Sequence, residues 1–134
     1  MRTLLAVALL LVGCAPLTDT AKTPSLDGTD WVMTAMPGAT LVADSKITLK
    51  FEQGSASGSA GCNQYRSTYT TNGSKLDFGM TSSTKRACLA QAMNVQENAY
   101  LNALTKVAAF EVSADRLTLR DAGGRTLLEF AKAR

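Results

Sequence analysis

"KITLKFE", residues 46–52, alternates strictly between polar and apolar side chains. Ile47, Leu49 and Phe51 fall on one face of an extended chain, and the charged residues and the threonine between them fall on the other. This period of two is typical of a strand in an antiparallel sheet that has one face buried and one face in water. The segment therefore predicts a sheet protein with these three apolar side chains in its core.

Further strand-like segments flank this one. Trp31, Met33 and Ala35 share one side of the first of them, and Asn72-Gly73 between the last two is a strong hairpin signal. The segments are "TDWVMTAM" (29–36), "SASGSAG" (55–61), "YRSTYT" (65–70) and "KLDFG" (75–79). A second group follows near the C-terminus, joined by the turns "ADR" and "DAGGR": "AFEVS" (109–113), "RLTLR" (116–120) and "RTLLEF" (125–130).

Between the two groups the apolar period changes from strand to helix. Met93, Tyr100, Leu101, Leu104 and Val107 recur at helical spacing. Asn94 followed by Glu97 resembles a capping box, which predicts a helix start near Val95.

Many strands, one helix and further strands predict an α+β fold. We expect an antiparallel curled sheet or open β-barrel with one packed helix. The predicted core places seven strand residues against three helix residues: Ile47, Leu49, Phe51, Leu117, Leu119, Leu128 and Phe130 against Tyr100, Leu101 and Leu104.

The N-terminus carries the pattern of a lipoprotein signal peptide. Met1-Arg2 is basic, and the apolar run Leu4–Val12 is far shorter than the ~20 residues that span a bilayer. The run ends in Leu11-Val12-Gly13-Cys14, which resembles a bacterial lipobox. We expect residues 1–13 to be removed and Cys14 to carry diacylglycerol and acyl chains such as palmitate. An ordinary signal peptide with an incidental Cys14 is the alternative.

Residues 14–25 predict a tether between this lipid and the folded domain, because they are small, polar and rich in proline. Residues 26–132 form the predicted domain. The resemblance to lipoproteins implies a bacterial envelope location, anchored to the membrane through Cys14. Ala15, where an aspartate would favour the inner membrane, indicates the outer membrane facing the periplasm.

Composition excludes several classes of function. The net charge of +3 is spread over scattered single residues, so nothing indicates nucleic-acid binding. The chain has no histidine, which removes histidine-activated nucleophiles and the commonest metal ligand. We expect no catalytic residues, no metal, no cofactor and a monomer.

Cys62 and Cys88 are the thiols that remain after lipidation of Cys14. An even pair in an oxidising envelope usually forms a disulfide. A loop of this size is worth roughly 3–4 kcal/mol in the chain-entropy model. We predict a structural disulfide that ties the glycine-rich strand to the polar segment Thr81–Ala87, with Gly61 allowing the backbones to approach. Free buried thiols are the alternative.

Several motifs together resemble the META domain family, which includes the HslJ-type heat-shock lipoproteins. The match spans Leu26 to Phe130, and its motifs are "GTDW" (28–31), "ITLKF" (47–51), "GSAGCNQY" (58–65), "LDFG" (76–79), "TKRAC" (84–88), "ENAYLNAL" (97–104) and "RLTLRDAGGRTLLEF" (116–130). The resemblance implies an antiparallel β fold with one packed helix, an envelope lipoprotein, and links to heat shock and drug tolerance. It implies no established enzymatic activity.

Two functions follow as hypotheses. The first is a non-enzymatic, lipid-anchored protein that binds an envelope protein or cell-wall partner and supports stress tolerance. The alternative is a carrier or sensor of an apolar ligand held between the curled sheet and the helix. Asn63, Tyr65 and Glu97 are the candidates for polar recognition, although Glu97 also fits a helix cap or an ion pair with Lys85 or Arg86, and Asn63 and Tyr65 also fit the fixing of a turn.

Overall fold

The computed structural model of the protein describes residues 13–15 and 22–134. The predicted signal peptide lies outside the described residues except for Gly13, and most of the predicted tether lies outside them too. The elements of the folded domain are β1 (Thr29–Ala35), β2 (Thr48–Glu52), β3 (Ser55–Ser59), β4 (Gln64–Asn72), β5 (Lys75–Phe78), β6 (Ser82–Ser83), α1 (Gln91–Leu104), β7 (Ala109–Ser113), β8 (Arg116–Arg120) and β9 (Thr126–Lys132).

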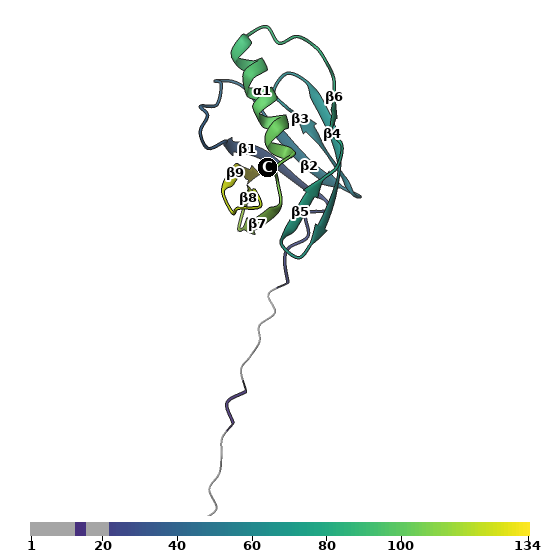
Figure 1. The fold of residues 1–134 in the computed structure, drawn as a ribbon, viewed down its shortest axis with the longest axis vertical. Coiled ribbons are helices and arrows are strands. Elements are labelled where there is room, and N and C mark those ends of the chain that lie inside the picture. Colours follow the sequence, from purple (N-terminus) through teal and green to yellow (C-terminus); the bar gives the residue numbers. More distant parts are fainter. Residues whose placement is uncertain (1–12, 16–21) are drawn as a thin grey trace, which may run out of the picture.

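The strands form one antiparallel sheet that curls into a ring. Their order is β3-β2-β1-β9-β8-β7-β5-β4-β6, and β3 also pairs with β4 from Ser55↔Thr68 to Ser59↔Gln64. The shortest strand pairing in this ring is that of β5 with β7, at Lys75↔Ala109. Figure 1 shows α1 packed against the upper part of this curl. The predicted fold class, an antiparallel curled sheet with one helix, is confirmed, although the ring is not a regular barrel.

The core has the composition that the strand phases predict. The predicted strand residues from Ile47 to Phe130 are at most 2% exposed, and so are Tyr100 and Leu104 of α1. Leu101 is half-buried and packs against this cluster. Asn72-Gly73 does form a hairpin turn, in which Asn72 of β4 pairs with Lys75 of β5. Alternation in the sequence therefore predicts both the strands and the faces that they bury.

The phase predicted for the end of β1 is wrong. Trp31 and Met33 are buried as expected, but Ala35 is only half-buried and Met36 is buried in its place. The pairing of β1 with β9 shifts register between Met33 and Ala35. An extra residue in one strand of a pair reverses the alternation beyond it, which is why the simple period fails here.

The predicted helix start is also wrong. The helix begins at Gln91, four residues before Val95, and Ala90 precedes it without a side-chain cap. Gln91, Ala92 and Met93 are all favourable helix residues, so nothing interrupts the helix before Asn94. The carboxylate of Glu97 is engaged elsewhere in the structure, which removes the capping box that the sequence suggested.

The chain enters the domain at one end, and α1 begins at the other end. The chain enters beside the β2–β3 turn, where Asp27 Oδ1 accepts a hydrogen bond of 2.6 Å from the backbone of Gln53. The loop before α1 and the first turn of α1 lie at the opposite end (Figure 1). No helix in the described residues has the length and apolar character needed to cross a membrane.

Phe51 provides a test of the core. Its ring is fully buried and contacts the rings of Tyr69 and Phe78, with centroids 4.8 and 6.1 Å away. We expect Phe51→Ala to lower the free energy of unfolding by about 3–5 kcal/mol, because it leaves a cavity in a closed sheet. Met80→Ala is the matched control, since Met80 is 94% exposed. Equal losses in denaturant titrations of the two variants would contradict the assigned core.

Candidate functional site

The predicted disulfide between Cys62 and Cys88 is present. Cys62 lies in the bend between β3 and β4, Cys88 lies in the loop before α1, and their Cα atoms are 5.8 Å apart. This separation falls in the range of 4.4–6.8 Å that disulfides usually span. The bond joins the end of β3 to the entrance of the helix, as the sequence predicted.

The role predicted for Gly61 beside this bond is wrong. A Cβ at Gly61 would make ordinary contacts, 3.4 Å from Met93 Cε, and would touch no backbone. Glycine is required there because its φ is +120°, a conformation that other residues rarely adopt. The close approach occurs instead at Gly58, where a Cβ would collide with the carbonyl oxygen of Thr48.

Asn63 is the centre of a buried polar network next to the disulfide. Its side chain is 5% exposed, and its Nδ2 donates to Glu97 Oε2 at 2.7 Å and to the Arg86 carbonyl at 3.0 Å. Its Oδ1 accepts from Thr84 Oγ1 and from the Arg86 backbone, both at 2.8 Å. Asn63 therefore joins the helix to the segment before it, and this segment is held by hydrogen bonds as well as by the disulfide.

Glu97 has neither the cap role nor the ion-pair role that the sequence suggested. It is 5% exposed, and its Oε1 accepts a hydrogen bond of 2.7 Å from the Asn63 backbone. It caps no helix, and within the described residues it forms no ion pair with Lys85 or Arg86. Both of its oxygens bond to Asn63, so a recognition role would require these bonds to be exchanged.

Tyr65 is bonded within the core. Its hydroxyl donates to the Thr48 carbonyl at 2.7 Å and lies 2.7 Å from the hydroxyl of Tyr100, which therefore donates to it. The two rings meet edge to face, with centroids 5.5 Å apart. Burial raises the pKa of both tyrosines well above the usual value, so both phenols remain neutral at physiological pH.

Gln96 is a buried polar residue that sequence reasoning missed. Its Oε1 accepts from the Val42 backbone at 2.7 Å, and its Nε2 donates to Ser45 Oγ at 2.9 Å. These bonds fix the helix to the loop between β1 and β2. The signal was available, because Gln96 and Glu97 occur one turn before Tyr100 and two turns before Leu104, on the buried face.

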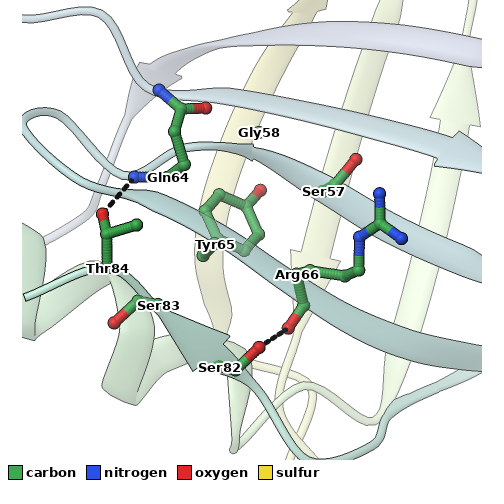
Figure 2. Close-up of a pocket in the computed structure, with 8 residues that line it drawn as sticks. All are labelled: Ser57, Gly58, Gln64, Tyr65, Arg66, Ser82, Ser83 and Thr84. Atoms are coloured by element: carbon green, nitrogen blue, oxygen red, sulfur yellow. Dashed lines mark hydrogen bonds between the residues drawn. The ribbon is translucent and has the colours of Figure 1, made fainter.

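A polar groove crosses the outer surface of β3, β4 and β6, with a volume of about 550 Å³. Figure 2 shows Arg66 extending along this groove near Ser57, with Ser82 and Ser83 on its other side. Arg66 forms no ion pair within the described part of the chain. The groove thus presents hydroxyl groups and one exposed guanidinium.

A second groove, of about 480 Å³, lies beside the disulfide. Its walls include Cys62, Cys88, Met93 and Leu89, and the side chain of Leu89 is fully exposed. An adjoining groove of about 560 Å³ runs between α1 and the loop after β1, and includes Val95, which is 63% exposed. Apolar side chains therefore flank the first turns of α1 on two sides. Leu89, Met93 and Val95 are here together called the helix-start patch.

One group of side chains in the described residues has the composition of a metal site. The ligand atoms of Cys62, Cys88 and Glu97 all lie within 4.8 Å of one another. In the disulfide form the two sulfurs are bonded to each other and are not thiolates, so this form lacks the charged sulfur ligands that zinc takes. Cys14, the predicted lipidation site, is exposed and is far along the chain from this group.

Comparisons with known proteins agree with this fold. A family model described as the META domain matches residues 24–134. An NMR structure of a protein from Burkholderia xenovorans is similar at 33% identity and a TM-score of 0.66, covering 81% of this chain and 83% of that one. A second NMR structure is 22% identical with a TM-score of 0.64, covering 79% and 90%. No curated protein sequence matches the chain.

Asn63 provides a test of the buried network. We expect Asn63→Ala to lower the free energy of unfolding by about 3 kcal/mol or more, because it leaves the buried Glu97 carboxylate without its side-chain donor and removes three part-buried hydrogen bonds to Thr84 and Arg86. Asn63→Asp should cost still more at neutral pH and less in acid, since it places a second carboxylate against Glu97. Asn102→Ala, on the exposed side of α1, is the control. Denaturant titrations at two pH values measure the free energy of unfolding. A loss for Asn63→Ala no larger than that for Asn102→Ala would contradict a stabilising role of the network.

The tyrosine pair predicts alkaline unfolding. The folded pKa values of Tyr65 and Tyr100 are raised, whereas an unfolded tyrosine ionises near pH 10. Their contribution to stability is therefore complete below about pH 10 and is lost as the pH rises further. The variant Tyr65→Phe/Tyr100→Phe should unfold less steeply above pH 10 than Tyr69→Phe, since Tyr69 is partly exposed. Circular dichroism against pH measures this, and parallel curves for the two variants would contradict it.

Proposed function

The chain belongs to the META domain family, and from this premise we propose that it is a lipid-anchored protein of the bacterial envelope that binds a partner without catalysis. The partner is an envelope protein or a cell-wall component, and binding supports tolerance of envelope stress. The lipid is carried by Cys14, in the outer membrane facing the periplasm. The N-terminal pattern that ends in Leu11-Val12-Gly13-Cys14 supports the anchor.

The helix-start patch is the observation that carries the binding role. Leu89 and Val95 are large apolar residues that water surrounds in the isolated domain. Leu89 and Met93 line the groove beside the disulfide, and Val95 lines the groove between α1 and the loop after β1. Exposed apolar side chains that gather at one place mark interaction sites more often than scattered ones do. A partner that covers this patch would remove the apolar surface from water.

The position of the patch favours a partner away from the anchoring membrane. The chain enters the domain beside Gln53, and the helix start lies at the other end (Figure 1). A lipid on Cys14 would keep the entry end, where the tether joins the domain, close to the membrane and leave the patch free to face the periplasm. The polar groove along Arg66 lies on the side between these ends and suits a polar or anionic group of the same partner.

The alternative function, a carrier of an apolar ligand, has less support. The space between the curled sheet and α1 holds the side chains of Tyr65, Tyr100 and Leu104, which are at most 3% exposed. Close-packed side chains leave no room for a ligand unless the core opens. The exposed apolar surface is outside the curl, where a protein partner can reach it.

The anchor is tested by mass spectrometry of the mature N-terminus. We expect the first residue to be Cys14 with diacylglycerol and acyl modifications, and we expect the protein in the membrane fraction. Cys14→Ser should remain unprocessed or appear in the soluble periplasm. Lys22→Ser is the control, since it changes the predicted tether without changing the lipobox. An unmodified Cys14 in the mature wild-type protein would end the lipoprotein assignment.

The binding role is tested by site-specific photo-crosslinking in living cells. A photoreactive residue at Leu89 should capture one discrete partner, and the same residue at Met80 should not, although Met80 is also an exposed apolar residue. Leu89→Asp should abolish capture from a photoreactive residue at Val95 while leaving the thermal unfolding temperature unchanged. Identical adducts from Leu89 and Met80 would show that exposure alone causes the capture.

A further inference from the structure

Three ligand-bearing side chains that are distant in the sequence converge beside the second groove. Cys62 comes from the bend after β3, Cys88 from the loop before α1, and Glu97 from the second turn of α1. The sulfur of Cys88 lies 3.9 Å from Glu97 Oε2. A thiolate and a carboxylate oxygen on one tetrahedral zinc ion would be about 3.6 Å apart. The native backbone therefore already holds these groups near the spacing of a metal site.

The carboxylate of Glu97 has no cationic partner among the described residues of the oxidised protein. Its carboxylate is buried, and its partners within the described residues are the neutral amide donors of Asn63. Buried carboxylates are usually paired with a cation or coordinate a metal. Two thiolates would add further negative charge within 4.8 Å of it. A divalent cation would neutralise this cluster, whereas no cationic side chain forms an ion pair with Glu97 in the described structure.

We propose that reduction of the Cys62–Cys88 disulfide creates a site for one zinc-like divalent cation, bound by the two thiolates and the carboxylate of Glu97. Sulfur ligands select a borderline-soft ion of this kind over calcium or magnesium. The fourth position faces the groove that Leu89 and Met93 line, where water or a partner's side chain completes the tetrahedron. Asn63 orients Glu97 through both of its oxygens, as outer-shell residues do in zinc sites.

Groups of both charges lie near the two sulfurs. Attack on a substrate disulfide needs a stabilised thiolate, which exchange enzymes obtain from nearby positive charge or from a helix N-terminus. Here Cys88 lies just before the N-terminus of α1, and an Arg86 guanidinium nitrogen lies 3.1 Å from the carbonyl oxygen of Cys62, but a carboxylate oxygen of Glu97 lies 3.9 Å from the Cys88 sulfur. A thiolate beside this carboxylate is stabilised when a cation binds both.

A phosphine serves as the reductant of the Cys62–Cys88 disulfide. The phosphine takes oxygen from one water and becomes a phosphine oxide, and the disulfide becomes two thiols with the two protons of that water. The cation then displaces both thiol protons as it binds. An added small-molecule disulfide can reverse this: it takes two electrons from the two thiolates and two protons from water and becomes two thiols, while the Cys62–Cys88 bond forms and the cation is released. The site thus has an oxidised metal-free form and a reduced metal-bound form.

Cobalt titration of the full chain carrying Cys14→Ser tests the proposal, because Cys62 and Cys88 are then the only thiols. After phosphine reduction we expect one equivalent of Co²⁺ to bind, with sulfur-to-cobalt charge-transfer absorption that Zn²⁺ abolishes. The oxidised chain should show no such absorption. Glu97→Gln should weaken binding by at least about tenfold, the lower end of the loss seen for outer-shell partners. Glu52→Gln, which changes an exposed carboxylate, should bind as the parent does.

A second measurement keeps the test valid where Glu97→Gln unfolds the chain. Zn²⁺ added to the reduced parent should shift the ¹³C resonance of the Glu97 carboxyl and leave that of Glu52 in place. Equal cobalt binding by the reduced and oxidised chains would overturn the site. Binding by the two thiolates with an unmoved Glu97 resonance, or with full affinity in folded Glu97→Gln, would overturn the role of Glu97.

Discussion

The buried amide of Asn63 is the constraint on which the functional end of the molecule depends. It sits between three pieces of chain that are far apart in the sequence: the bend after β3, the segment from Thr84 to Arg86, and α1 through Glu97. Both of its side-chain polar atoms form hydrogen bonds, the oxygen with Thr84 and Arg86 and the nitrogen with Arg86 and Glu97. A buried polar network is stable when every member is satisfied and costly when one is missing. The three pieces therefore adopt this arrangement together, and the position of Cys88 and the shape of the groove beside it follow.

This end of the domain is built differently from the rest. The sheet is held by strand pairing and by apolar side chains that are almost fully buried. The start of α1 is held by Gln96, Glu97 and the disulfide, while Leu89 and Val95 remain exposed. Polar bonds and one covalent bond fix the backbone here without covering the apolar side chains. The result is a rigid edge with apolar surface left for a partner.

The sequence predicts the sheet better than the site, for a physical reason. Strand faces leave a period of two in the chain, so the local pattern correctly predicts that Leu49, Phe51 and Leu119 are buried. The bulge in β1 breaks that period at one residue, and no local pattern in the sequence predicts it. The partners of Asn63 lie 21 to 34 residues away and are chosen by geometry in three dimensions. Hydrogen bonds of this kind have no periodic signature, which is why the sequence pattern around Glu97 indicates a cap instead.

The disulfide and the Asn63 network connect the same two regions, and they act on different states. A covalent loop stabilises mainly by restricting the unfolded chain, whereas the hydrogen bonds of Asn63 exist in the folded chain. Reduction therefore removes the restriction on the unfolded state and leaves the bonds that position Thr84, Arg86 and Glu97. Cys62, next to Asn63, and Cys88, two residues after Arg86, then stay close to each other in the folded reduced protein. Preorganised groups bind a ligand with little further loss of conformational freedom, and this is the physical basis on which one pair of cysteines can serve as a bond in one state and as ligands in the other.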